Sequence, residues 1–243
     1  MPHKEEGNAI LWDFDGTLVD TRRKNLNVTR AIVEAVTGRR SDTIEALTSL
    51  ATYAGAIARA TNWRDLYADA FGLTGPDIDA AGRLWTEYQL RDATATPVFD
   101  GIAEVLDGLH QWPHGIVSQN GKANIKAILE AGDLAHYFGA IVGYEEVEFG
   151  KQKPAPEGLF RCLQVLTHLK PGYVFYIGDH ETDTLSAARA KEVVKQGDVA
   201  IEFISIGALY GATVSDPSWE VMPDYIAREP MDIVDIVECC MTR

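Results

Sequence analysis

The sequence predicts an α/β fold in which a core with a parallel sheet is interrupted by an inserted α-helical subdomain. Three apolar runs typical of buried strands each end in a cluster of polar residues, at residues 9–11, 114–117 and 173–177. Residues 21–96 show helical periodicity and contain no such cluster. With 243 residues and 46% hydrophobic content, the chain can bury one core of this kind together with an insertion.

The first polar cluster, residues 13–17, reads DFDGT and follows the apolar run at its carboxyl end. Side chains two residues apart lie on the same side of an extended chain, so Asp13 and Asp15 can converge on one reacting group while Phe14 points away. Two carboxylates this close repel each other unless a cation or a shared proton intervenes, and Mg²⁺ is the natural hard-oxygen partner. Asp13 is therefore a candidate nucleophile, the alternative being an ordinary Asp-Gly turn after a strand.

Two later clusters supply groups that suit a phosphoryl anion. Residues 118–121 read SQNG, and the Ser118 hydroxyl and the backbone N–H of Gln119 would form a phosphate cradle before a helix. Lys153 stands before Pro154 at the start of another expected helix, where its charge could neutralise a transferred phosphoryl group. Taken alone, the first is a common turn and the second is an ordinary solvated lysine.

The last cluster, residues 178–183, reads GDHETD and follows a predicted strand. It contributes Asp179 and Asp183, which share one side of a helix start. Acidic residues at this position can also simply complement the helix dipole. We interpret His180, between them, as an exposed helix-start residue.

In order and spacing, these four clusters resemble the motifs of the haloacid dehalogenase (HAD) superfamily of phosphatases, and the resemblance spans Ile10 to about Gly211. It implies a Rossmann-like parallel-sheet core with a helical cap, a Mg²⁺ cofactor and hydrolysis of a small-metabolite phosphomonoester through an aspartyl phosphate. By this resemblance the chain looks like the phosphoglycolate phosphatases and their neighbours. Gln119 after the motif serine and a long stretch at residues 191–199 depart from the commonest pattern.

The resemblance also implies a role for each motif residue. The catalytic residues would be Asp13 as nucleophile, Asp15 as general acid and then base, and Lys153. The phosphate ligands would be Thr17, Ser118, Gln119 and Lys153. The metal ligands would be Asp13, Asp15 through its backbone carbonyl, and Asp179, while Asp183 would orient Lys153 or a metal-bound water. Because a halide leaves without a proton whereas an alkoxide needs one, Asp15 favours phosphoryl transfer over dehalogenation.

Two alternatives remain open at this point. A β-phosphoglucomutase-like enzyme would use the same chemistry, although that family usually has Glu-Asp where this chain has Gly178-Asp179. A phosphate-binding regulatory protein could keep the fold without turnover, but every catalytic side chain is present.

We expect residues 1–20 and 97–243 to form the core and residues 21–96 the cap. Apolar spacing predicts four amphipathic cap helices, around residues 26–36, 44–54, 66–71 and 84–88. Hinges near Asp20 and Thr96 would let the cap exclude water and select the leaving group. Six basic residues are candidate substrate contacts, although a surface role is commoner for each: Arg22, Arg23, Lys24, Arg59, Arg64 and Arg91. A helix at 122–131 and a strand at 140–143 leave no room for a second cap.

Composition limits the classes of partner that the chain could bind. The formal net charge of −14 argues against binding nucleic acid, and we find no long apolar run for a membrane span and no secretory signal. The cysteines Cys162, Cys239 and Cys240 form no disulfide framework, which favours a reducing cytoplasm. The expected partner is a small phosphorylated metabolite, bound by a monomer or homodimer.

Overall fold

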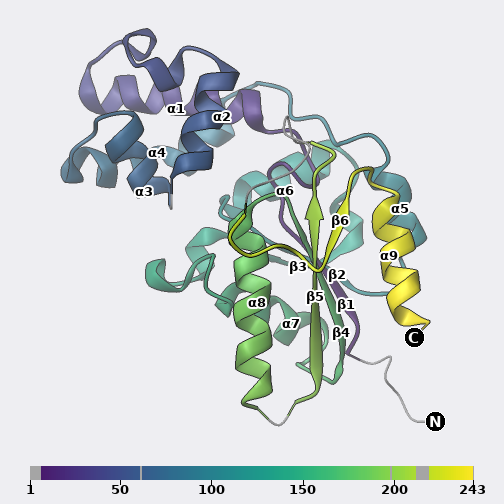
Figure 1. Ribbon diagram of the computed structural model, residues 1–243. Coiled ribbons are helices and arrows are strands. Elements are labelled where there is room, and N and C mark those ends of the chain that lie inside the picture. Colours follow the sequence, from purple (N-terminus) through teal and green to yellow (C-terminus); the bar gives the residue numbers. More distant parts are fainter. Residues whose placement is uncertain (1–6, 61, 198, 212–218, 243) are drawn as a thin grey trace. The chain divides into compact units, whose positions relative to one another are not determined.

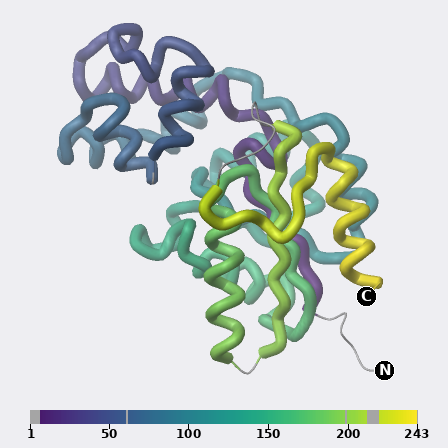
Figure 2. Tube along the Cα trace, in the orientation of Figure 1, coloured from purple at the N-terminus to yellow at the C-terminus, as the bar shows by residue number. Residues whose placement is uncertain are grey.

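The computed structural model describes residues 7–60, 62–197, 199–211 and 219–242. Its internal contacts divide the chain into two compact units. The core unit contains Met1–Asp20 and Pro97–Arg243, and the helical unit contains Thr21–Thr96. The two segments of the core unit, purple for the first and teal to yellow for the second, fold together as one body (Figure 2).

The core unit is built on a six-stranded parallel sheet with helices on both faces (Figure 1), which confirms the predicted fold class. The strand order is β3-β2-β1-β4-β5-β6. The strands are β1 (Ala9–Trp12), β2 (His114–Val117), β3 (Phe138–Val142), β4 (Gly172–Gly178), β5 (Ile201–Ala208) and β6 (Tyr225–Ala227). The helices are α5 (Ile102–Gly108), α6 (Lys122–Ala131), α7 (Glu157–Leu166), α8 (Glu181–Lys195) and α9 (Asp232–Met241).

Strand β1 is buried on both faces because helices cover both. Ile10 and Trp12 pack in one hydrophobic cluster with residues of α5, α6 and α9, whereas Ala9 and Leu11 pack in another with residues of α7 and α8. This explains why β1 is an uninterrupted apolar run rather than an alternating one. Trp12 lies within the core, as expected, and its indole N–H donates to Nδ1 of His114 at 3.0 Å.

The chain changes direction across the sheet at β1, since β2 and β3 lie on one side of it and β4 to β6 on the other. In open parallel sheets the carboxyl ends of strands at such a switch point form the ligand crevice. The loops after β1 and β4, which carry two of the predicted motifs, meet at this point.

Helix α6 has the predicted bounds, and α7 begins directly after Pro156. Residues 191–195 complete α8, so the long stretch expected before the next strand is partly helical. The last residues of strand β5, up to Ala208, pair with β6. In the described part of the chain, no helix is long and apolar enough to cross a membrane. The charged residues 1–6 lie outside the described residues.

The helical unit contains two long helices, α1 (Arg22–Thr37) and α4 (Gly75–Arg91), and the shorter α2 (Leu50–Arg59). One hydrophobic cluster joins them. The remaining elements are the 3₁₀ turns η1 (Ser41–Thr43) and η2 (Glu45–Leu47), the single turn α3 (Trp63–Asp65) and the π-helical turn η3 (Leu66–Ala70).

The second predicted cap helix, residues 44–54, is wrong at its start. Helix α2 begins only at Leu50, because the Ser49 side chain accepts the N–H of Thr52 and the Thr52 hydroxyl accepts the N–H of Ser49, which is a capping box. Apolar residues ahead of this cap lie in 3₁₀ turns. Spacing alone did not show where the helix starts.

The end of the core unit's first segment and the start of its second segment run side by side where the helical unit is inserted. The N–H of Asp20 donates to the carbonyl of Pro97 at 2.8 Å, and the N–H of Phe99 donates to the carbonyl of Leu18 at 3.1 Å. Val19 and Val98 form an antiparallel bridge between these bonds. Both connections therefore leave the core from one short paired ribbon.

Candidate active site

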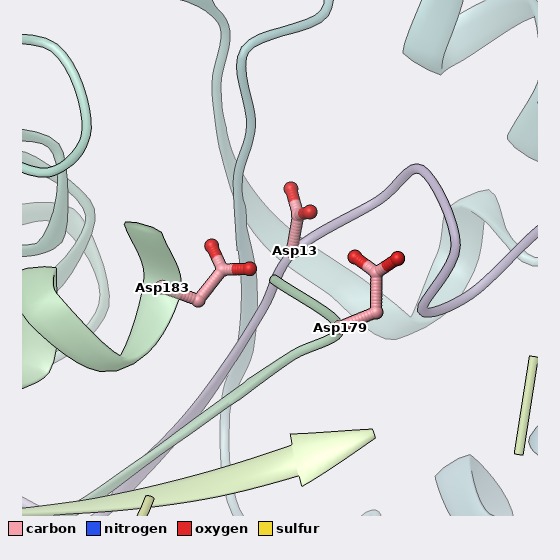
Figure 3. Close-up of side chains that lie close together, drawn as sticks. All are labelled: Asp13, Asp179 and Asp183. Atoms are coloured by element: carbon pink, nitrogen blue, oxygen red, sulfur yellow. The ribbon is translucent and has the colours of Figure 1, made fainter. Parts of the chain in front are cut away.

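Three carboxylates meet at the carboxyl ends of β1 and β4 (Figure 3). Asp13 follows β1, Asp179 follows β4, and Asp183 lies in the first turn of α8. One oxygen of each lies within 4.8 Å of the others. The sheet therefore brings residues of the first and last motifs to one point, as the strand-end argument predicts.

Two glycines make this approach possible. Gly16 has a φ of +81°, and a Cβ at this position would lie 2.1 Å from Oδ2 of Asp179. A Cβ on Gly178 would lie 2.3 Å from Cγ of Asp183. Both carboxylates thus occupy space that any other residue type would fill, which gives the Asp-Gly and Gly-Asp pairs of the motifs a physical reason.

Lys153 joins two of the carboxylates. Its Nζ lies 2.7 Å from Oδ1 of Asp13 and 2.6 Å from Oδ1 of Asp183, and its side chain is only 6% exposed. It also lies 5.5 Å from the ring centroid of Tyr176. The charge expected from the third motif is therefore in direct contact with the expected nucleophile.

Asp183 is held by donors on three sides. Besides Lys153, the Tyr176 hydroxyl donates to its Oδ1 at 2.9 Å and the backbone N–H of His180 donates to its Oδ2 at 3.2 Å. His180 itself is the N-cap of α8, as its interpretation as a helix-start residue requires, but it is half-buried rather than exposed. Sequence reasoning missed Tyr176, which it treated only as an aromatic residue of a strand. The available signal was a hydroxyl in an apolar run, which indicates a buried polar partner but not which one.

Burial and crowding set the electrostatics. Burial raises the pKa of Asp13 to about 7; Asp183 and Asp15 also raise this pKa, while Lys153 lowers it. Burial likewise raises the pKa of Asp179 well above its usual range, with Asp13 adding to the effect. Burial opposes the charge on Lys153, but Asp13 and Asp183 outweigh it and the pKa of the lysine is raised. One ammonium thus faces more carboxylates than it can neutralise, and a set of crowded carboxylate oxygens fits a divalent hard cation.

Asp15 lies outside the three-carboxylate cluster. Its carboxylate oxygens accept hydrogen bonds of 3.2 and 3.1 Å from Nδ2 of Asn120, a residue that sequence reasoning did not single out. Different side chains therefore lie against the two acids of the first motif: Lys153 contacts Asp13, and the Asn120 amide contacts Asp15.

The predicted phosphate-binding residues line the same region. The Ser118 hydroxyl accepts the N–H of Asn120 at 3.2 Å, and the exposed Gln119 donates through its amide to the Lys153 carbonyl at 3.3 Å. Thr17 is fully buried, and its hydroxyl has no hydrogen-bond partner among the described residues. A buried hydroxyl without a partner is costly, so that of Thr17 is suited to a ligand that supplies one.

Arg64 and Arg91, two of the candidate arginines, form ion pairs within the helical unit. Arg64 pairs with Asp79 at 2.7 Å, and Arg91 pairs with Glu87 at 2.7 Å. Arg59 is exposed. The first two therefore match the surface role that was the commoner expectation.

Residues 10–194 match the sequence profile of the family described as haloacid dehalogenase-like hydrolase. The chain belongs to this family. The match confirms the resemblance drawn from the motifs.

Several family members are similar to the chain in sequence. The phosphoglycolate phosphatase of Photorhabdus laumondii is 25% identical over 196 residues, which cover 75% of this chain and 76% of that protein. The phosphoglycolate phosphatase of Escherichia coli K12 is 26% identical over 141 residues, 57% of this chain and 50% of that protein. The protein of the same name from Vibrio vulnificus is 24% identical over 62% of this chain and 60% of its own length. The chain thus spans half to three-fifths of the length of the last two relatives.

Solved structures share the fold over nearly the whole chain. A haloacid dehalogenase-like family hydrolase from Streptococcus pneumoniae has a TM-score of 0.69 at 19% identity, covering 94% of this chain and 97% of its own. A HAD-superfamily hydrolase of subfamily IA from Geobacter sulfurreducens has a TM-score of 0.60 at 22% identity, covering 95% and 96%.

Proposed function

We propose that this hydrolase is a Mg²⁺-dependent phosphatase that cleaves a small-metabolite phosphomonoester through an aspartyl phosphate on Asp13. The observation that carries the proposal is the contact of Lys153 with Asp13, 2.7 Å, beside a cluster of carboxylates. A nucleophile held against a buried ammonium suits attack on a group whose negative charge the ammonium can stabilise. Names of the relatives make phosphoglycolate the first substrate to test.

The proposed reaction has two halves. In the first, a carboxylate oxygen of Asp13 attacks phosphorus, the bond from phosphorus to the leaving oxygen breaks, and Asp15 gives its proton to that oxygen. In the second, Asp15 takes a proton from water, the water oxygen bonds to phosphorus, and the bond between Asp13 and phosphorus breaks. Ser118, Thr17 and Lys153 would bind the phosphoryl oxygens throughout, with the backbone of Gln119.

Asp13, Asp179 and the backbone carbonyl of Asp15 would hold Mg²⁺, which supplies positive charge against the phosphoryl oxygens when it is bound. Asp183, whose oxygens already accept three donors, would instead hold Lys153 in place. With a formal net charge of −14 on the chain, this local positive charge is what allows an anionic substrate to bind.

Two features favour hydrolysis of a phosphate ester over the alternatives. Asp15 offers the proton that an alkoxide needs and a halide does not. At the position where the mutases have a glutamate, a Cβ on Gly178 would collide with Asp183. The mutase interpretation therefore loses support, and a non-catalytic protein would have no reason to retain the whole acid, base and lysine set.

The helical unit, Thr21–Thr96, would act as the cap that excludes water and selects the leaving group, with hinges near its two boundaries. Free cysteines, including the buried Cys162, support action in a reducing cytoplasm, as a monomer or homodimer.

The test is a screen of inorganic phosphate release from phosphoglycolate, sugar phosphates, nucleotides and pyrophosphate, with Mg²⁺ and with EDTA. We expect Mg²⁺-dependent release from at least one monoester and at least a thousandfold loss in Asp13→Asn, which keeps the side-chain volume but removes the attacking anion. Release of a phosphorylated sugar without inorganic phosphate would favour the mutase. No turnover on any ester, or retention of more than a few per cent of activity by Asp13→Asn, contradicts the proposal.

A further inference from the structure

Asn120 lies in the turn between β2 and α6 and reaches across to the first motif, 105 residues earlier in the chain. Its Nδ2 lies 3.2 Å from Oδ1 and 3.1 Å from Oδ2 of Asp15, so one amide group faces both carboxylate oxygens. Asn120 is 2% exposed, whereas Asp15 is half-buried. A buried amide group thus contacts a more accessible carboxylate.

The amide of Asn120 can present only its NH₂ side to Asp15. Its Oδ1 accepts the backbone N–H of Gly121 at 2.8 Å and Nδ2 of Asn124 at 3.2 Å. Asn124 is 1% exposed and lies in the first turn of α6. The backbone N–H of Gly121 can only donate, so it requires the carbonyl oxygen of Asn120 on that side, which leaves the amide nitrogen toward Asp15.

From this geometry we propose that Asn120 is a positioning residue that orients the Asp15 carboxyl group for proton transfer, and that Asn124 fixes the Asn120 amide. The inference rests on the proposed function and deepens it. Proton transfer requires the acid within hydrogen-bond reach of the leaving oxygen and then of the water, so rotation of Asp15 away from that line slows both halves of the reaction. An amide nitrogen donates but accepts no proton, so it holds the carboxylate without competing for the proton that Asp15 transfers.

The readout is leaving-group dependence, which a merely structural role does not change. An acidic phenol leaves with little help from Asp15, whereas an alkoxide needs its proton. We expect Asn120→Ala to lower kcat/KM about ten- to a hundredfold on the best alkyl phosphate of the panel but less than about threefold on para-nitrophenyl phosphate. Asn124→Ala should produce a smaller loss of kcat/KM, again mainly on the alkyl phosphate.

Asn8→Ala is the matched control. Asn8 is also a buried asparagine, 2% exposed, but it lies before β1 at the opposite end of the sheet, where it accepts the backbone N–H of Tyr173. Asn8→Ala should lower stability without changing the ratio of the kcat/KM values for the two substrates. In an Asp15→Asn background, adding Asn120→Ala should change neither rate further, because Asn120 acts through Asp15.

Equal losses on both substrates in Asn120→Ala, or a further alkyl-selective loss in the Asp15→Asn background, overturn this inference while leaving the phosphatase proposal intact. If Asn120→Ala does not fold, as judged by circular dichroism, Asn124→Ala decides alone: an unchanged ratio then overturns the inference. A wild-type protein that hydrolyses neither ester overturns the proposed function, and the inference with it.

Discussion

The Tyr176 hydroxyl donates a hydrogen bond of 2.9 Å to Oδ1 of Asp183, the same oxygen that lies 2.6 Å from Nζ of Lys153. The hydroxyl also lies 3.3 Å from the carbonyl of Val117, within hydrogen-bond distance. A single carboxylate oxygen therefore ties the lysine to a residue of strand β4. The position of the ammonium depends on a buried hydroxyl that does not itself reach Asp13.

Tyr176→Phe removes this hydroxyl and keeps the ring beside Lys153. We expect the free energy of unfolding to fall by about 1 to 2 kcal/mol, because a buried carboxylate loses a donor. Since Lys153 would serve every substrate, kcat/KM should fall about three- to tenfold on alkyl and aryl phosphates alike. Urea unfolding and the two-substrate assay measure both effects, with Tyr173→Phe on the same strand as control. A change in substrate ranking would contradict the assigned role.

Asp179→Asn should make the metal-free protein more stable. Its carboxylate is crowded by Asp13 and its pKa is raised well above normal, so its ionisation opposes folding at neutral pH. In EDTA we expect the midpoint of thermal unfolding to rise by a few degrees. Mg²⁺ should stabilise the wild type but not the variant, because only the former keeps the binding site.

Asp183→Asn is the matched comparison, and it should lower the midpoint of thermal unfolding instead of raising it. This carboxylate accepts Lys153, Tyr176 and the N–H of His180, so its loss leaves good donors with a weaker acceptor. Stabilisation by both substitutions, or by neither, would show that the two acids do not differ as their contacts indicate.

Gly16→Ala should damage both stability and metal binding. The new Cβ meets Oδ2 of Asp179 at 2.1 Å, and the residue has a φ of +81°. Gly38→Ala is the control, since Gly38 has a φ of +66° but nothing within 4 Å. We expect about 1 kcal/mol of backbone strain in each, with a larger loss for Gly16→Ala. Titration calorimetry should show weakened Mg²⁺ binding in Gly16→Ala only; equal behaviour of the two variants would contradict the steric argument.

His114 should make the protein less stable in mild acid. Burial lowers its pKa to about 4, and the neutral ring accepts the Trp12 indole N–H at Nδ1 while Nε2 faces the Leu109 carbonyl. The unfolded chain takes up a proton near pH 6.5 and the folded one only near pH 4, so stability present above pH 6.5 is lost as the pH falls between these values. The loss at pH 5 relative to pH 8 should be about 2 kcal/mol.

The control for this effect is His114→Gln, which does not titrate. The acids of the active site change protonation in both proteins, so their contribution cancels in the difference. Urea unfolding at several pH values should show a wild-type stability that declines relative to the variant below pH 6.5. Parallel curves for the two proteins would refute the role of His114.

Much of the core could be predicted because its signals are local. Helix α6 matches its predicted bounds, since helical periodicity and the preceding turn lie within a few residues of one another. The position of Asp13 and Asp179 at strand ends could also be predicted from the sequence, because a buried parallel strand is an apolar run that ends where its loop begins. The start of α2 was not, because a side-chain cap at Ser49 outweighed the apolar spacing of residues 44–47.

The sequence alone therefore determined the identity of the motif residues, the order of the motifs and the class of fold, all of which follow from patterns along the chain. Only the tertiary structure decided which groups meet: Lys153 against Asp13, Tyr176 against Asp183, and Asn120 against Asp15. The physical reason is that a hydrogen bond between residues 105 positions apart depends on strand order and on where two turns end, to within a few tenths of an ångström. An asparagine in a turn, or a tyrosine hydroxyl in an apolar run, does not indicate along the chain which residue it will contact.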